Sequence, residues 1–247
     1  MGFQLFLMKY SEPDPHQLRL TILDTEPLQA LHEGPWPHCG RRLQVLADRW
    51  TCTNTDFLGE IPHAHDFSGS LSLDVVDPWT GTKLESLLGL KNLQRGVAGL
   101  AASPDGDRLY VVDREMSVTV VDLSDSRVLE GGKLEVPEEW QLMEKAIAPS
   151  PDGQRLFLGF ATGKDRHRAL VNEVWAYDTT TWERTATIQM RDPATHLAFS
   201  AAGDQLYAVS PAGQSLMIYD ANTYQEMAVL SDLGGSPARV VVPGVGR

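Results

Sequence analysis

Two histidines, separated by one residue, form the cluster in this sequence that most resembles a set of metal ligands. His63 and His65 flank Ala64, and Asp66 follows them. Because alternate residues of an extended chain face the same side, both imidazoles could bind one ion. Zinc needs four ligands, or three and a water molecule, and no second cluster is evident to supply the rest. Pro62 and nearby glycines indicate a loop. We therefore expect a solvated loop here, with a metal site as the weaker alternative.

The densest basic stretch of the sequence lies at residues 164–168. It separates two apolar runs typical of strands, which predicts that it forms the tip of a hairpin. A solvated turn would account for this composition. The alternative is a contact surface for an acidic partner, formed by Lys164, Arg166, His167 and Arg168.

The sequence contains two cysteines, Cys39 and Cys52. If bonded, they close a loop of about 14 residues, for which the entropy lost by the unfolded chain gives roughly 3 kcal/mol of stabilisation. A disulfide would also indicate an oxidising compartment such as the periplasm. The residues themselves leave open the alternative of two reduced, buried thiols in a cytoplasmic protein.

The motifs of several common enzyme classes are missing from the sequence. It has no Gly-x-Ser-x-Gly nucleophile elbow, no glycine-rich phosphate loop and no His-Glu-x-x-His pair. Ligands for a metal at the centre of a repeat protein would come from different repeats, and the sequence does not pair them. No catalytic residue is therefore identified.

A repeated phrase, a tight turn followed by a strand, organises the chain. Ser-Pro-Asp-Gly occurs at 103–106 and at 150–153, and a weaker copy, Ser-Ala-Ala-Gly, at 200–203. Pro and Asp suit the early positions of such a turn, and Gly supplies the positive φ that closes it. The apolar and aromatic residues that follow favour strands. Strands are also predicted before the turns, over Val97–Ala102, Lys145–Ala148 and Thr195–Phe199.

A second phrase, a short apolar strand that ends in aspartate before a polar turn, occurs five times at intervals of 42 to 56 residues. Units of about 40 to 50 residues with four short strands each are typical of β-propeller blades. Each aspartate is predicted to cap the turn that follows it through a side-chain oxygen. These residues are Asp24, Asp77, Asp122, Asp178 and Asp220.

The two phrases predict an all-β protein, a single β-propeller domain over residues 1–247 in which five four-stranded blades are recognisable. Residues 2–7 match the segments that follow the turn glycines, so the first unit lacks its innermost strand. Either a closing strand near the C-terminus completes a five-bladed ring, or the chain is the later part of a larger propeller. The approximate units, followed by the closing strand, are 2–33, 34–92, 93–136, 137–190, 191–233 and 237–242.

The charge balance argues against a nucleic-acid partner. The chain has 33 acidic and 21 basic side chains and a formal net charge of −12, whereas affinity for phosphate backbones comes from clustered Lys and Arg. Its apolar runs are also far shorter than the roughly 20 residues that span a bilayer. We expect neither a membrane span nor a secretory signal peptide in this sequence.

The cysteines, set around a predicted hairpin turn at Ala47-Asp48, and the C-terminal end of the chain carry a family resemblance. Matching segments lie at 5–11, 20–24, 165–168, 174–181, 216–220 and 233–237. On these residues the chain resembles the heavy (large) subunit of the quinoprotein amine dehydrogenases, the methylamine and aromatic amine dehydrogenase family. That subunit is a seven-bladed propeller, and the resemblance covers its C-terminal five-sevenths.

The resemblance implies a non-catalytic scaffold. In this family the heavy subunit supports a light subunit, which carries the tryptophan tryptophylquinone cofactor for oxidative deamination of primary amines. The complex passes electrons to a small copper protein or a cytochrome. For this chain the resemblance implies no cofactor of its own, a Cys39–Cys52 disulfide and a periplasmic location. It also implies that the first blades and the signal peptide are missing, and that residues 164–168 are a candidate contact for the light subunit.

Two other functions stand as alternatives to this oxidoreductase scaffold. One is a stand-alone propeller for protein–protein interaction, which would agree with reduced Cys39 and Cys52 in the cytoplasm. The other is a lactonase-type hydrolase with a metal ion in the central channel of the propeller.

Overall fold

The computed structural model describes residues 4–10, 18–25, 28–36, 42–46, 49–57, 69–77, 82–93, 97–103, 105–125, 127–162, 169–200 and 202–233. Side chains are described for 74–77, for 82–86 and for the described residues from 97 onward. Every regular element in these ranges is a β-strand, which confirms the predicted all-β class. The chain divides into two compact units, Met1–Gln94 and Arg95–Arg247.

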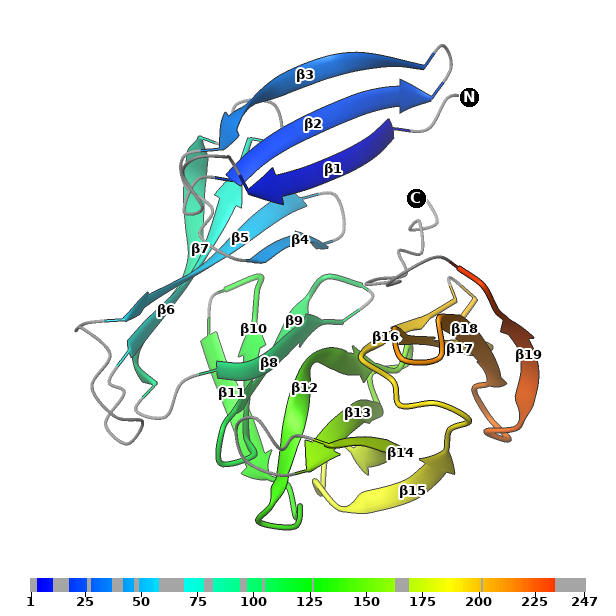
Figure 1. Ribbon diagram of the computed structural model, residues 1–247. Coiled ribbons are helices and arrows are strands. Elements are labelled where there is room, and N and C mark those ends of the chain that lie inside the picture. Colours follow the sequence, from blue (N-terminus) through cyan, green and yellow to red (C-terminus); the bar gives the residue numbers. More distant parts are fainter. Residues whose placement is uncertain are drawn as a thin grey trace. The chain divides into compact units, whose positions relative to one another are not determined.

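The first unit contains two antiparallel sheets (Figure 1). One has the order β1-β2-β3, with strands Gln4–Tyr10, Leu18–Thr25 and Leu28–Trp36. The other has the order β4-β5-β6-β7, with strands Arg42–Leu46, Arg49–Phe57, Gly69–Val76 and Lys83–Leu93. The pairing of β4 with β5 places Leu46 opposite Arg49, as the hairpin predicted around residues 47–48 requires.

The second unit contains three successive groups of four antiparallel strands (Figure 1). The first group is β8 to β11, with strands Val97–Ala102, Arg108–Asp113, Ser117–Asp122 and Arg127–Lys133. The second is β12 to β15, with strands Trp140–Pro149, Arg155–Thr162, Ala169–Asp178 and Arg184–Gln189. The third is β16 to β19, with strands His196–Phe199, Gln205–Ser210, Ser215–Asp220 and Glu226–Leu230. We call these groups sheets A, B and C.

The first strands of sheets A, B and C lie side by side. β12 is in contact with β8, and it pairs in parallel with β16 at Lys145 and His196, which joins sheets B and C into one curled eight-stranded sheet. These three strands form an inner row, and in each group the remaining strands follow the first in sequence order as an antiparallel meander. Consecutive four-stranded meanders that share an inner row are the arrangement of a β-propeller, so the second unit is propeller-like.

The predicted turns and inner strands of the second unit are confirmed. Gly106, Gly153 and Gly203 have φ values of 78°, 68° and 79°, the left-handed region that glycine adopts without steric cost. β8 spans the predicted Val97–Ala102, and β12 and β16 contain or overlap the other two predicted strands.

The core of the second unit lies between neighbouring sheets and consists of two clusters of buried side chains. One packs Trp175 against Trp140 and Phe160, with ring centroids 4.7 and 5.1 Å apart. The other surrounds Phe157, whose ring meets that of Phe199 edge-on at 5.1 Å. Aromatic residues from the second and third strands of sheet B supply much of this packing, which holds the sheets together.

Candidate functional site

The serine turns are built from one set of hydrogen bonds, seen clearly at Ser150. Its Oγ accepts the N–H of Arg155 at 2.9 Å and donates to Asp152, and its backbone N–H donates to the Arg155 carbonyl at 2.7 Å. The N–H of Gly153 donates back to the Ser150 carbonyl at 2.8 Å. The backbone bonds and the bond accepted by the serine hydroxyl recur at Ser103 and Ser200. The hydroxyl of Ser103 donates to Asp105, and that of Ser200 donates to Asp204, which lies later in its turn. The repeated serine and aspartate therefore serve the architecture of the turn.

The aspartate turns lie on the same edge of each sheet as the serine turns. In a four-stranded meander the first and third connections share an edge, and a backbone hydrogen bond ties them together in sheets A, B and C. These bonds run from Leu123 to Asp107, Thr179 to Gln154 and Ala221 to Asp204, at 2.8, 3.0 and 2.9 Å. We call this edge of the second unit the turn face.

The predicted capping role of the aspartates is confirmed where their turns are described. Oδ1 of Asp178 accepts the N–H groups of Thr180 and Thr181 at 2.7 and 2.8 Å. Asp122 and Asp220 cap their own turns in the same way. The turns that follow Asp24 and Asp77 lie outside the described residues.

These caps predict a loss of stability in acid. The backbone hydrogen bonds hold the pKa values of Asp178 and Asp220 below their ordinary range. A carboxylate with a depressed folded-state pKa stabilises the fold fully above its unfolded-state value, about 3.9, and loses this contribution as the pH falls through the folded value. We expect the urea midpoint to fall as the pH is lowered below about 4. The double variant Asp178→Asn, Asp220→Asn should show a shallower fall, because Asn accepts the same bonds without titrating. Parallel pH profiles of the two proteins would contradict this role.

A cleft of about 310 Å³ opens on the turn face between sheets A and B. Sheet A contributes both of its turns to the lining, and sheet B contributes the serine turn at Pro151, Asp152 and Gly153. The cleft is strongly acidic, because four carboxylates line it and only one cationic side chain, Arg108. These carboxylates belong to Asp105, Asp107, Asp122 and Asp152.

A buried hydroxyl also lines this cleft. Tyr110 is 1% exposed, and its hydroxyl oxygen makes no hydrogen bond. Burial raises the pKa of Tyr110, against a smaller lowering by the nearby Arg108 guanidinium. The corresponding residues of sheets B and C are Phe157, which has no hydroxyl, and Tyr207, whose hydroxyl donates to Gln205 at 2.8 Å. Tyr110 is thus the residue at this position that brings a buried hydroxyl to the lining of the cleft, with the Arg108 guanidinium as its neighbouring charge.

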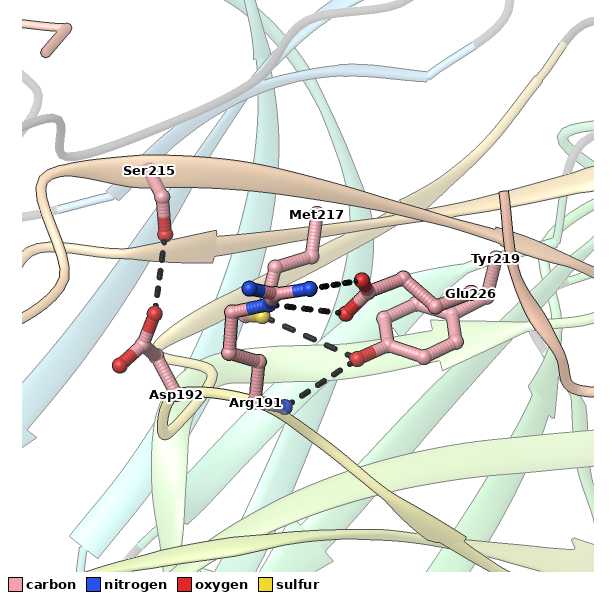
Figure 2. A network of polar contacts seen from close by, with 6 residues as sticks. All are labelled: Arg191, Asp192, Ser215, Met217, Tyr219 and Glu226. Atoms are coloured by element: carbon pink, nitrogen blue, oxygen red, sulfur yellow. Dashed lines mark hydrogen bonds and ion pairs between the residues drawn. The ribbon is translucent and has the colours of Figure 1, made fainter. Parts of the chain in front are cut away.

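A second polar cluster, in sheet C, has a structural role. Figure 2 shows the Arg191 guanidinium against the Glu226 carboxylate, with its Nε–H donating at 3.2 Å. The backbone N–H of Arg191 donates to the buried Tyr219 hydroxyl at 3.3 Å. Hydrogen bonding to Glu226 raises the pKa of Arg191, and the reciprocal bond lowers that of Glu226. The cluster attaches the connection between sheets B and C, which contains Arg191, to the outer strand β19, which contains Glu226.

The side chains proposed from sequence for chemistry lie outside those that the structure describes. Cys39, His63 and His65, and the basic residues Lys164, Arg166, His167 and Arg168, fall in undescribed segments, and Cys52 is described only as part of β5. Among the described side chains, no group of three or more His, Cys, Asp or Glu residues could hold a metal ion. The same part of the chain has no helix that is long and apolar enough to cross a membrane.

The acidic cleft is not predicted by the sequence. It forms where the turns of sheets A and B meet, whereas the sequence pattern describes each turn separately. The one difference visible in the sequence is Tyr110 at the position that Phe157 occupies in the next unit, and this difference by itself does not indicate a cleft.

Comparisons with known proteins identify no family. No protein-family model matches the chain. No curated protein matches it. Among solved structures it is similar to the hydrazine synthase of Kuenenia stuttgartiensis, with a TM-score of 0.44 and 20% identity over 60% of this chain and 39% of that one. It is also similar to U3-55K, with a TM-score of 0.43 and 20% identity over 57% of this chain and 41% of that one. The chain spans about two fifths of the length of these structures, and the propeller-like assignment rests on its own sheets.

Proposed function

We propose that this protein is a non-catalytic β-propeller scaffold that holds a partner protein. The observation that carries the proposal is that the repeated polar residues form hydrogen bonds within their own turns. In three successive sheets the turn serines and aspartates are engaged in hydrogen bonds that shape the turns, so the repeat serves architecture. What it leaves exposed is a carboxylate-rich surface, which suits recognition of a basic partner surface.

The proposal includes a propeller of five blades. The strand groups of the second unit supply three of them, and the sheets β1–β3 and β4–β7 supply the other two. A closing strand at residues 237–242 would complete the first blade of a closed ring. In the alternative form, the five blades are the later part of a seven-bladed propeller.

On the sequence resemblance, the partner is the light subunit of an amine dehydrogenase. This protein would then support oxidative deamination of primary amines in the periplasm. The tryptophan tryptophylquinone group would belong to the light subunit, so no residue of this chain is assigned to it. Electrons would leave the complex for a small copper protein or a cytochrome. The Cys39–Cys52 disulfide is part of the same proposal.

The test is native purification of the tagged chain from its source cells. We expect a small, cysteine-rich subunit to co-purify in a fixed ratio, to stain for quinone redox cycling, and to be absent from a tag-only control. Mass spectrometry of the alkylated chain should show Cys39 and Cys52 protected until a reductant is added. A chain that purifies alone from the cytoplasm with both thiols free would overturn the proposal and favour a stand-alone propeller.

A further inference from the structure

We propose that the acidic cleft between sheets A and B binds an organic cation, an alkylammonium or guanidinium group. The ligand is either a small free amine or the side chain of a lysine or arginine on a partner. This inference does not depend on the light subunit, because binding is measured on the isolated full-length chain.

The charge of the cleft selects a cation. Four carboxylates and one guanidinium line it, so its formal charge favours positive ligands and repels anions. The hydrogen bonds described for Asp105, Asp122 and Asp152 are all accepted by Oδ1. Among the described residues no hydrogen bond is given to their Oδ2 atoms, and we assign these oxygens to the N–H groups of a ligand.

The hydroxyl of Tyr110 gives the cleft a fixed polar contact. A buried hydroxyl without a hydrogen bond is costly, and the Phe157 position shows that the repeat can place a plain ring at the same point. A ligand N–H group donating to the Tyr110 oxygen would satisfy this atom. The charge-assisted bonds to the carboxylates would fix the rest of the cation.

The same lining favours an organic cation over a compact metal ion. A bound Ca²⁺ needs six to eight oxygen ligands at short distances, and the described residues hold no group of three acidic, His or Cys side chains placed for a metal. An ammonium or guanidinium group spreads its charge over several N–H donors, so it can bridge carboxylates that are further apart. The volume of about 310 Å³ lies at the lower end of the range for small-molecule sites.

The test is calorimetric titration of the full chain with 1,5-diaminopentane, with a lysine-rich peptide and with CaCl₂. We expect saturable binding of at least one of the two ammonium probes, weakened about tenfold as NaCl is raised from about 0.02 M to about 0.3 M. Binding of the diamine alone would indicate a small-amine site, and tighter binding of the peptide would indicate a docking site for a partner's side chains. Pentane-1,5-diol, which has the same length and no charge, should not bind.

Three variants locate the ligand. Tyr110→Phe and Asp152→Asn should each weaken binding about three- to tenfold, because each removes one contact. Arg108→Gln should strengthen it severalfold by removing the competing cation, and the repeat already uses glutamine at this position in Gln205. Asp204→Asn is the matched control. It removes the same charge from a serine turn of sheet C, outside the cleft lining, and should leave binding nearly unchanged.

Several outcomes would overturn the proposal. They are failure of both ammonium probes to bind, equal losses in Asp152→Asn and Asp204→Asn, or Ca²⁺ binding that displaces the diamine. Because Tyr110→Phe copies the aromatic residue of sheet B, we expect it to fold. Arg108→Gln is expected to strengthen binding where the other two variants weaken it, so the proposal remains testable if one variant is unstable.

Discussion

Replacing Trp175 with alanine is expected to lower the free energy of unfolding by about 3–5 kcal/mol. Trp175 is 5% exposed in β14, and its ring packs against Trp140 and Phe160. Its indole N–H also donates to Glu173 at 2.7 Å. The substitution removes a large apolar surface and leaves a cavity that the fixed strands of sheet B can fill only in part.

The measurement is equilibrium unfolding in urea, where the midpoint should fall while the slope changes little. Arg184→Gln is the control. The Arg184 guanidinium lies 4.1 Å from the Trp175 ring centroid but is exposed, so its loss should cost only about 0.5–1 kcal/mol. A Trp175→Ala variant within 1 kcal/mol of the parent would show that the aromatic cluster does not hold sheets A and B together.

Replacing Gly159 with valine is expected to destabilise the protein by about 1–3 kcal/mol or more, although valine is the residue found at the corresponding positions of the other two sheets. Counted from the turn serines, the corresponding residues of sheets A and C are Val112 and Val209. A consensus argument would therefore predict a stabilising change. In the structure, however, a Cβ atom on Gly159 would lie 2.9 Å from the Cβ of Ala146 and 3.1 Å from the backbone oxygen of Ala194.

The crowding has an identifiable source. The pairing of β12 with β13 shifts register between Leu142, opposite Phe160, and Ile147, opposite Leu158. The intervening residues of β12, which include Ala146, therefore lie opposite the single residue Gly159. The backbone oxygen of Ala194, 3.1 Å from the same Cβ position, cannot move as a side chain could. Urea unfolding should show a lower free energy of unfolding for Gly159→Ala than for the parent protein, and a still lower one for Gly159→Val. Greater stability in the valine variant would mean that this region relaxes freely and that the repeat consensus holds.

Much of the fold can be predicted from the sequence because its signals are local. The Ser-Pro-Asp-Gly phrases fix turns through a side chain and a glycine within four residues, and Gly106 and Gly153 adopt the predicted conformation. The strand that ends in Asp178 and the capped turn after it follow from adjacent residues in the same way. Local hydrogen bonds of this kind depend little on the rest of the molecule, so the sequence alone predicts these turns and the strands beside them.

The candidate site could not be predicted in this way, because its parts belong to different units. Asp105 and Asp152 are identical members of identical phrases, and nothing in either phrase says that they line one cleft. Tyr110 and Phe157 are interchangeable as strand residues, but only the packing of two sheets turns the extra hydroxyl into a buried atom without a partner.

The sequence by itself determined an acidic all-β chain of repeated units, with turns closed by glycine and capped by aspartate. Local chemistry is sufficient for those features. Only the tertiary structure shows at which repeated positions a residue's surroundings differ from one unit to the next. At Gly159 a valine side chain no longer fits, and at Tyr110 a hydroxyl lines the same cleft as four carboxylates. The physical reason is that burial, steric contact and the summed field of several charges depend on residues far apart in sequence, and only the packing of one sheet against the next brings them together.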